Sequence, residues 1–258
     1  SGKTPEQMLR DRELYASEEI DERLSADVAR YQAGEPLAYI LGEWDFAGMT
    51  LTITPDVLIP RDDTMAVTEL AMKRALFLDQ NPRILDLCAG SGAIGLAVVT
   101  EVPGSEVWAV EKSEQTAEWT RRNLNETAQA HPSIIGNYHL EIGDATQMPT
   151  LHQLDGTIDI VLTNPPYVPL SEIPEQPEVR DYDPDMALYG GSADGTLIPE
   201  RIILRAGKLL RPGGLLVMEH DISQGERLAA YANAHGFANT RVRNDYTGRP
   251  RYLISGKS

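Results

Sequence analysis

The sequence predicts an α/β fold built on a seven-stranded, mostly parallel sheet with helices on both faces. From residue 83 onward, short apolar runs alternate with helical stretches, a pattern typical of such sheets. A glycine-rich loop follows the first of these runs and opens a helix, as at the ligand crevice of open α/β sheets. The length of 258 residues, 41% of them apolar, suits one large domain with a small appendage.

The first part of the chain has a helical pattern that ends in a strand pair. A break at residues 34–36 separates the helical part from strands expected at 44–46 and 50–53, joined by a turn at 47–48. Asp63 and Thr64 are expected to cap a helix that runs to about Leu78. Apolar residues spaced as on amphipathic helices are Leu9, Leu14, Ile20, Leu24, Val28 and Tyr31.

The remaining elements follow from the apolar runs and from the breaks between them. Residues 212–214, Pro-Gly-Gly, are expected to form a tight turn just before a strand. Residues 168–196 are expected to form one long irregular connection, which in a compact domain is usually functional or disordered. Strands are expected at 84–87, 106–110, 138–142, 158–163, 215–219, 240–243 and 252–255, and helices at 93–100, 114–127, 197–210 and 223–235.

Composition disfavours several classes of protein. No apolar run approaches the ~18 residues of a membrane-spanning helix, and the single cysteine, Cys88, cannot form an internal disulfide. The formal net charge is −16, which suits a basic protein partner better than the phosphates of a nucleic acid. The five histidines match no metal-ligand spacing. We therefore expect a cytoplasmic monomer that binds no metal or membrane and forms no stable complex with nucleic acid.

The glycine loop is compatible with two classes of ligand. Gly90, Gly92 and Gly95 satisfy G-x-G-x-x-G, the dinucleotide fingerprint. A dinucleotide places its pyrophosphate at the helix N-terminus, where a nearby carboxylate would repel it. Asp86 is expected to face that crevice from the end of the strand, and its charge suits the sulfonium and ammonium groups of S-adenosylmethionine. The loop therefore favours S-adenosylmethionine over NAD.

Two further acids follow the next two strands. Glu111 ends the second strand, 21 residues after Gly90, at a spacing from which it can accept hydrogen bonds from ribose hydroxyls. Asp144 follows the third strand and is placed to reach an adenine amino group. Each acid alone would suit a helix cap or a turn. Three acids after three successive strands favour a crevice for an adenosyl ligand.

The fourth strand runs directly into Asn164, Pro165, Pro166 and Tyr167, beside the glycine loop. The prolines lack N–H donors, so the Asn164 side-chain oxygen and the Pro165 carbonyl form a pair of acceptors for one NH2 group. Tyr167 offers a flat face to a planar amide or base. Holding both hydrogens would free the delocalised lone pair of a planar nitrogen for methyl transfer. A rigid turn with a packed tyrosine is the plain alternative.

Three other functions remain open from the residues alone. The same tetrapeptide would serve an exocyclic amine of a base in DNA or RNA, although a base in a duplex must first be flipped out. A non-catalytic protein would bind S-adenosylmethionine or a partner as a scaffold, which the intact tetrapeptide disfavours. An NAD-dependent oxidoreductase would use the same glycine loop, which Asp86 disfavours.

The loop, Glu111 and the tetrapeptide together resemble class I S-adenosylmethionine-dependent methyltransferases. Residues 34–42 (GEPLAYILG), 58–64 (LIPRDDT) and 182–195 (YDPDMALYGGSADG) are similar to the HemK/PrmC family, and the resemblance covers residues 34–258. It implies a Rossmann-like fold, with S-adenosyl-L-methionine as methyl donor and S-adenosyl-L-homocysteine as product. It also implies a substrate, the glutamine amide in the Gly-Gly-Gln motif of class I peptide chain release factors.

The resemblance further implies a division of the chain and a set of site residues. Residues 1–43 would form a shortened helical docking segment, 44–57 a hairpin linker and 58–258 the catalytic domain. Asn164, Pro165, Pro166 and Tyr167 would bind the glutamine, with Asn164, Pro165 and Tyr167 catalytic. Cofactor-binding residues would be Asp86, Cys88, Ala89, Gly90, Ser91, Gly92, Glu111, Asp144, Ala145 and Asn164.

The chain departs from the family pattern in three places. Cys88 replaces the usual first glycine of the loop. Asp62 and Met65 replace a proline and an acid that flank the Arg61-x-Asp63-Thr64 motif, whose role the sequence does not assign. The N-terminal helical segment is shorter than the usual docking domain. None of these changes touches the expected acceptor pair.

Overall fold

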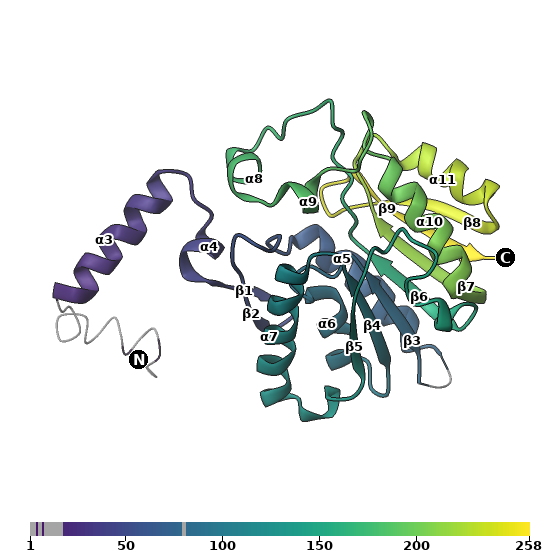
Figure 1. Cartoon of the computed structure of the whole chain (residues 1–258), viewed down its shortest axis with the longest axis horizontal. Helices are drawn as coiled ribbons and strands as arrows, with labels where there is room; N and C mark the ends of the chain where they lie inside the picture. Colours follow the sequence, from purple (N-terminus) through teal and green to yellow (C-terminus); the bar gives the residue numbers. More distant parts are fainter. Residues whose placement is uncertain (1–3, 5–6, 8–17, 79–80) are drawn as a thin grey trace.

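A computed structural model describes residues 4, 7, 18–78 and 81–258, and its centre is a seven-stranded sheet (Figure 1). The strand order is β5-β4-β3-β6-β7-β9-β8. Strands β5 to β7 in this order are parallel, and β9 runs antiparallel to both β7 and β8. The predicted mostly parallel sheet is confirmed. The strands are β3 Arg83–Leu87, β4 Glu106–Glu111, β5 Tyr138–Ile142, β6 Ile158–Thr163, β7 Leu210–Glu219, β8 Phe237–Asn244 and β9 Pro250–Lys257.

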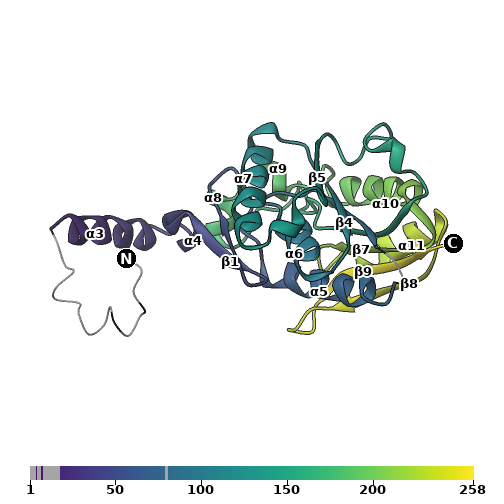
Figure 2. The same ribbon diagram turned by 90° about the horizontal axis from the view of Figure 1, so that it is seen from below.

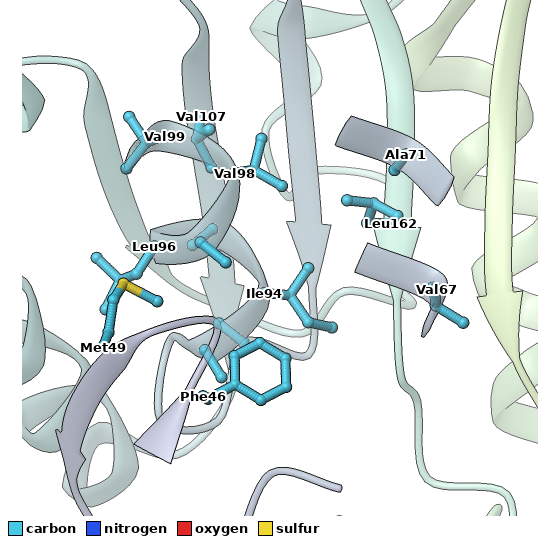
Figure 3. Close-up of a cluster of buried hydrophobic side chains, with 14 of the residues drawn as sticks. Phe46, Met49, Val67, Ala71, Ile94, Leu96, Val98, Val99, Val107 and Leu162 are labelled. Atoms are coloured by element: carbon cyan, nitrogen blue, oxygen red, sulfur yellow. The ribbon is translucent and has the colours of Figure 1, made fainter. Parts of the chain in front are cut away.

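Both faces of the sheet are covered because its strands are apolar on both sides, as expected of a buried parallel sheet. On one face α5 (Asp62–Ala75), α6 (Ala93–Glu101) and α7 (Glu114–Ala130) pack against residues such as Ile84 and Leu162. Figure 3 shows Ile94, Leu96 and Val98 of α6 in this layer. The opposite face carries α10 (Leu197–Leu209) and α11 (Gly225–Ala234). The expected helices in these regions are therefore confirmed.

The N-terminal part consists of two helices and a hairpin. Helix α3 (Glu18–Gln32) extends away from the sheet in both views (Figures 1 and 2), and short helix α4 (Leu37–Leu41) follows it. The hairpin β1 (Glu43–Phe46) and β2 (Met49–Thr52) is confirmed, with positive φ at Ala47 and Gly48 in its two-residue turn. Of the apolar residues expected on amphipathic helices, Leu9 and Leu14 lie outside the described residues.

Three local predictions are wrong. Asp63 and Thr64 do not cap α5, because they lie within its first turn. The N-cap residue is Arg61, whose side chain makes no capping hydrogen bond. Residues 212–214 lie inside β7, where the register against β6 jumps from Leu210 to Leu215, so they form an irregularity rather than a turn before the strand. The connection 168–196 contains two short helices, α8 (Pro177–Tyr182) and α9 (Asp185–Leu188). Two 3-10 turns, Pro132–Ile134 and His152–Leu154, complete the described elements.

None of the helices described is long and apolar enough to cross a membrane. No group of three or more His, Cys, Asp or Glu side chains in the same part of the chain is arranged to hold a metal ion.

Candidate active site

A cavity of about 340 Å³ opens at the carboxyl ends of β3, β4, β5 and β6. Its volume is in the range of small-molecule sites, and its position is where open α/β sheets bind ligands. The chain segments that follow the four strands all contribute, as does the segment before α5. Most of the expected site residues line the cavity, namely Cys88, Ala89, Gly90, Ser91, Glu111, Asp144, Ala145, Asn164 and Pro166. Asp86, Gly92, Pro165 and Tyr167 are not among the lining residues.

Glu111 holds the glycine loop in place from the neighbouring strand. Its Oε2 accepts a hydrogen bond from the Gly90 N–H at 2.9 Å, and its Oε1 accepts one from the Ser113 N–H at 2.8 Å. Thr120 of α7 donates to the Gly90 carbonyl at 2.7 Å. Each Glu111 oxygen keeps a second lone pair beside the cavity, so the carboxylate can still accept from a ligand hydroxyl.

Asp144 is fixed by the turn that follows β5. Its Oδ1 accepts hydrogen bonds from the backbone N–H and the hydroxyl of Thr146, and its Oδ2 lies 3.0 Å from the Lys112 ammonium. Burial acts to raise the pKa of Asp144, but these partners lower it below its usual range. Asp144 therefore stabilises the turn, as the plain alternative for this residue expects, and it also lines the cavity.

The structure corrects the expected placement of Asp86. This side chain is fully buried beneath α6, where its Oδ2 accepts a hydrogen bond from the Gly95 N–H at 2.9 Å and its Oδ1 has no partner. The residue shares the sheet face of Ile84, which α6 covers, and so does not face the crevice. Burial raises the pKa of Asp86 to about 7, despite the opposing Gly95 hydrogen bond, and the nearby Glu111 charge adds to the rise.

Asp86→Asn is expected to stabilise the protein more at pH 8 than at pH 5. A carboxyl whose pKa is about 7 when folded and near 4 when unfolded makes the fold less stable as pH rises through that interval. The asparagine keeps an acceptor for Gly95 and removes the charge, so its advantage should grow by about 2 to 3 kcal/mol between the two pH values. Urea denaturation at both pH values measures this, and an equal effect at both would contradict the buried charge.

Cys88 adopts the left-handed backbone conformation, with φ +69°, at the position where glycine is usual in the resembling family. A side chain costs about 1–2 kcal/mol there, whereas glycine loses about 0.5–1 kcal/mol through its greater freedom in the unfolded chain. We expect Cys88→Gly to raise the free energy of unfolding by about 0.5–1 kcal/mol. Cys88→Ala is the control, because it removes the thiol and keeps the strain. Equal stabilisation by both variants would contradict the backbone explanation.

Asn164 is held by a chain of buried hydrogen bonds. Its Nδ2 donates to the Thr64 hydroxyl at 3.1 Å, and that hydroxyl donates to Glu219 Oε2 at 2.9 Å. No residue in the described part of the chain donates to the Asn164 Oδ1 or to the Pro165 carbonyl. Asn164 lines the cavity, so its oxygen can reach a ligand there, whereas Pro165 is buried and is not among the lining residues. Thr64 and Glu219 were not predicted as site residues.

Tyr167 is fixed from behind by the same glutamate. Its hydroxyl donates to Glu219 Oε1 at 2.9 Å and accepts from the Arg251 guanidinium at 2.7 Å. Burial raises the pKa of Glu219 above its usual range, while Arg251 and the hydroxyls of Thr64 and Tyr167 oppose that rise. Gln224, also missed, donates from its amide to the backbone carbonyls of Tyr167 and Asp194 at 2.8 and 2.9 Å. The tetrapeptide is thus clamped to β7, β9 and the 190–195 segment.

The three family-like motifs outside the glycine loop meet beside this site. Buried Asp183 accepts a hydrogen bond from the Tyr39 hydroxyl at 2.8 Å and forms an ion pair with Arg61. Tyr39 also donates to the Val57 carbonyl at 3.0 Å. The Arg61-x-Asp63-Thr64 motif therefore links the segment that bears Asp183 to the start of α5, where Thr64 contacts Asn164.

Comparison with known proteins identifies the family. Two sequence profiles match, one described as the PrmC N-terminal domain over residues 1–42 and one as conserved hypothetical protein 95 over residues 66–176. The release factor glutamine methyltransferase of Bifidobacterium longum is 62% identical over 225 residues, which are 86% of this chain and 76% of that protein. The chain belongs to the release factor glutamine methyltransferase family. A further member, from Streptomyces coelicolor, is 39% identical over 93% of this chain and 82% of its own length.

Solved structures agree with this family on the fold. A predicted O-methyltransferase from Agrobacterium tumefaciens matches with a TM-score of 0.52 and 21% identity, over 73% of this chain and 80% of that one. A precorrin-6y C5,15-methyltransferase from Geobacter metallireducens matches with a TM-score of 0.51 and 16% identity, over 81% and 94%. This member of the release factor glutamine methyltransferase family therefore has the Rossmann-like class I methyltransferase fold, as the sequence predicts.

Proposed function

We propose that this protein transfers a methyl group from S-adenosyl-L-methionine to the side-chain amide nitrogen of the glutamine in the Gly-Gly-Gln motif of class I peptide chain release factors. The observation that carries the proposal is the pair of acceptors formed by Asn164 Oδ1 and the Pro165 carbonyl, neither of which has a described donor within the protein. Two oxygen acceptors suit an NH2 group, which has two hydrogens to donate. The names of the relatives support a release factor glutamine as the substrate.

The residues around the cavity fit S-adenosyl-L-methionine better than a dinucleotide. Glu111 and Asp144 border the cavity as carboxylates, which suit hydroxyl, amino and cationic groups and repel a pyrophosphate. Glu111 also accepts from Gly90, so it occupies the start of the loop where a phosphate would lie.

The protein's part in the reaction is positioning and hydrogen bonding. The cofactor, when bound, supplies a methyl group activated by attachment to a sulfonium. Asn164 and Pro165 hold both hydrogens of the glutamine amide, which favours a pyramidal nitrogen whose lone pair points at the methyl carbon. Transfer would form a bond from this nitrogen to the methyl carbon while the carbon–sulfur bond breaks, and the nitrogen would then lose a proton to solvent. No strong base is needed, because the proton leaves only after the nitrogen has become cationic.

The remaining assignments belong to the same proposal. Residues 1–43 would dock the release factor, residues 44–57 would link this segment to the rest of the chain, and residues 58–258 would form the catalytic domain. The protein would act as a monomer in the cytoplasm. Support for docking comes from α3, where Leu24, Val28 and Tyr31 expose apolar side chains at helical spacing. A base in DNA or RNA is the less favoured substrate, because the chain carries a formal charge of −16.

A labelled-methyl transfer assay tests the proposed substrate. The protein is incubated with labelled S-adenosyl-L-methionine and either a class I release factor, the same factor with its Gly-Gly-Gln glutamine replaced by alanine, or total RNA and DNA. We expect label only in the unaltered factor. Label in nucleic acid but not in the factor would replace this substrate with a base, and label in neither would contradict the assignment.

A further inference from the structure

The orientation of the Asn164 amide decides whether the site presents an acceptor or a donor. The Oδ1 and NH2 ends of an asparagine have nearly the same shape, so packing alone does not distinguish them. With Oδ1 toward the cavity the site grips a substrate NH2. With the amide turned over, two NH2 groups would face each other and the grip would be lost.

The hydrogen-bond donors and acceptors of Arg251, Glu219 and Thr64 determine the orientation of the Asn164 amide. Arg251 has only donors, and its Nη2 lies 3.2 Å from Glu219 Oε1; this ion pair favours the ionised carboxylate, whose two oxygens can only accept. The Thr64 hydroxyl has one hydrogen, which it gives to Glu219 Oε2 at 2.9 Å. Toward Asn164 the same hydroxyl can then only accept. Asn164 must therefore turn its Nδ2 to Thr64, at 3.1 Å, and its Oδ1 away from Thr64.

We propose that Glu219, acting through Thr64, is a positioning residue that holds the Asn164 amide with its oxygen toward the substrate. The proposal rests on the proposed function, since it concerns the same methyl acceptor. Glu219 is buried at the end of β7, in the same strand as the buried apolar residues Val217 and Met218, so its carboxylate is costly unless each oxygen is hydrogen-bonded. Oε1 serves Tyr167 and Arg251, and Oε2 serves Thr64.

Glu219→Gln replaces one acceptor oxygen of the carboxylate with an NH2 donor and leaves the shape of the side chain nearly unchanged. Because Arg251 can only donate, the new side-chain amide must keep its oxygen toward Arg251 and turn its NH2 toward Thr64. Thr64 then accepts from that NH2 and gives its own hydrogen to Asn164, which turns its Oδ1 inward and its NH2 to the cavity. We expect kcat to fall by about 100-fold, the size of effect seen when a positioned hydrogen-bonding group is removed from an active site. The KM for S-adenosyl-L-methionine should change by less than about threefold.

Removing the Thr64 hydroxyl, which lies between Glu219 and Asn164, distinguishes a change in the orientation of the Asn164 amide from a general loss of structure at the site. Thr64→Val alone leaves the Asn164 amide without a preferred orientation and should lower kcat by about 10-fold, whereas Thr64→Ser should retain it. In the double variant Glu219→Gln/Thr64→Val no hydrogen is directed at Asn164. Its kcat should therefore match that of Thr64→Val, about 10-fold above Glu219→Gln alone.

Glu106→Gln provides a matched control. Glu106 lies in β4 at the opposite end of the same sheet, where it pairs with His139, and its substitution should leave kcat within about twofold. A double variant no more active than Glu219→Gln, or Glu219→Gln within threefold of the unaltered protein, would overturn the positioning role. If Glu219→Gln does not fold, the Thr64→Val and Thr64→Ser pair decides, and equal kcat values for the two would overturn it.

Side-chain amide NMR keeps this test separate from the identity of the substrate. The Asn164 NH2 signal, assigned by its loss in Asn164→Asp, should exchange with water about 10-fold faster in Glu219→Gln than in the unaltered protein, because its protected hydrogen moves to the cavity. Unchanged exchange would overturn the proposal. If the unaltered protein methylates no release factor, the proposed function fails, and the NMR result still decides the orientation.

Discussion

Asn164→Ala is expected to lower kcat for methyl transfer to a release factor by about 1000-fold, close to background. The substitution removes the Oδ1 acceptor of the pair, so the amide nitrogen of the glutamine is no longer held with its lone pair exposed. The fold should persist, because Asn164 contributes one side-chain hydrogen bond, to Thr64, and is only half-buried. Steady-state kinetics with release factor, together with circular dichroism, measures both effects.

The control for this variant is a surface asparagine. Asn137→Ala removes an exposed side chain whose amide donates to the Ser133 carbonyl far from the cavity, and its kcat should stay within twofold. Near-normal activity of Asn164→Ala would contradict the role given to the acceptor pair. An unfolded Asn164→Ala protein would contradict the claim that the residue serves the reaction rather than the fold.

Gly195→Ala should be strongly damaging although Gly195 does not line the cavity. Gly195 has φ +71°, and a Cβ there would lie 2.1 Å from the Tyr167 carbonyl oxygen and 2.9 Å from the Pro169 nitrogen. Both neighbours are backbone, so the 190–195 segment and the tetrapeptide must separate. We expect a loss of at least about 3 kcal/mol in the free energy of unfolding and a fall in kcat of about 100-fold as Tyr167 moves.

Gly156→Ala isolates the steric part of this effect. Gly156 has nearly the same φ, +72°, but a Cβ there would meet no atom within 4 Å. Its replacement should cost only about 1 kcal/mol and leave kcat unchanged. Urea denaturation and kinetics of the two variants make the comparison. Similar costs for both would show that backbone strain, not contact with Tyr167, makes Gly195 necessary.

The sheet was predictable because each strand is a short apolar run bounded by breaks, and local patterns of this kind determine strand positions. The burial of these strands on both faces also prevented a correct prediction of the sheet face on which Asp86 lies. Residues 84–87 of β3 are buried on both faces, so alternation gave no sign that Asp86 faces α6 rather than the crevice. The Pro-Gly-Gly irregularity in β7 was not predicted because it depends on how β7 pairs with β6, a strand that lies far from it in the sequence.

The residues that line the cavity were predictable where they lie at the ends of strands: Glu111 ends β4 and Asn164 directly follows β6. Glu219 carried the same signal, an acid at the end of an apolar run, but its contact with Thr64 joins positions 155 residues apart. The ion pair of Arg61 with Asp183 likewise joins segments 122 residues apart. Spacing along the chain holds no information on such pairs. Only the fold shows that these motifs meet at Asn164.

The most direct test of the account is a structure of the protein with S-adenosyl-L-homocysteine and a release-factor domain that carries the Gly-Gly-Gln loop. We expect the glutamine nitrogen to lie within about 3 Å of both the Asn164 Oδ1 and the Pro165 carbonyl, with the sulfur on its open side. A glutamine held elsewhere, or an Asn164 NH2 turned toward it, would contradict the central claim.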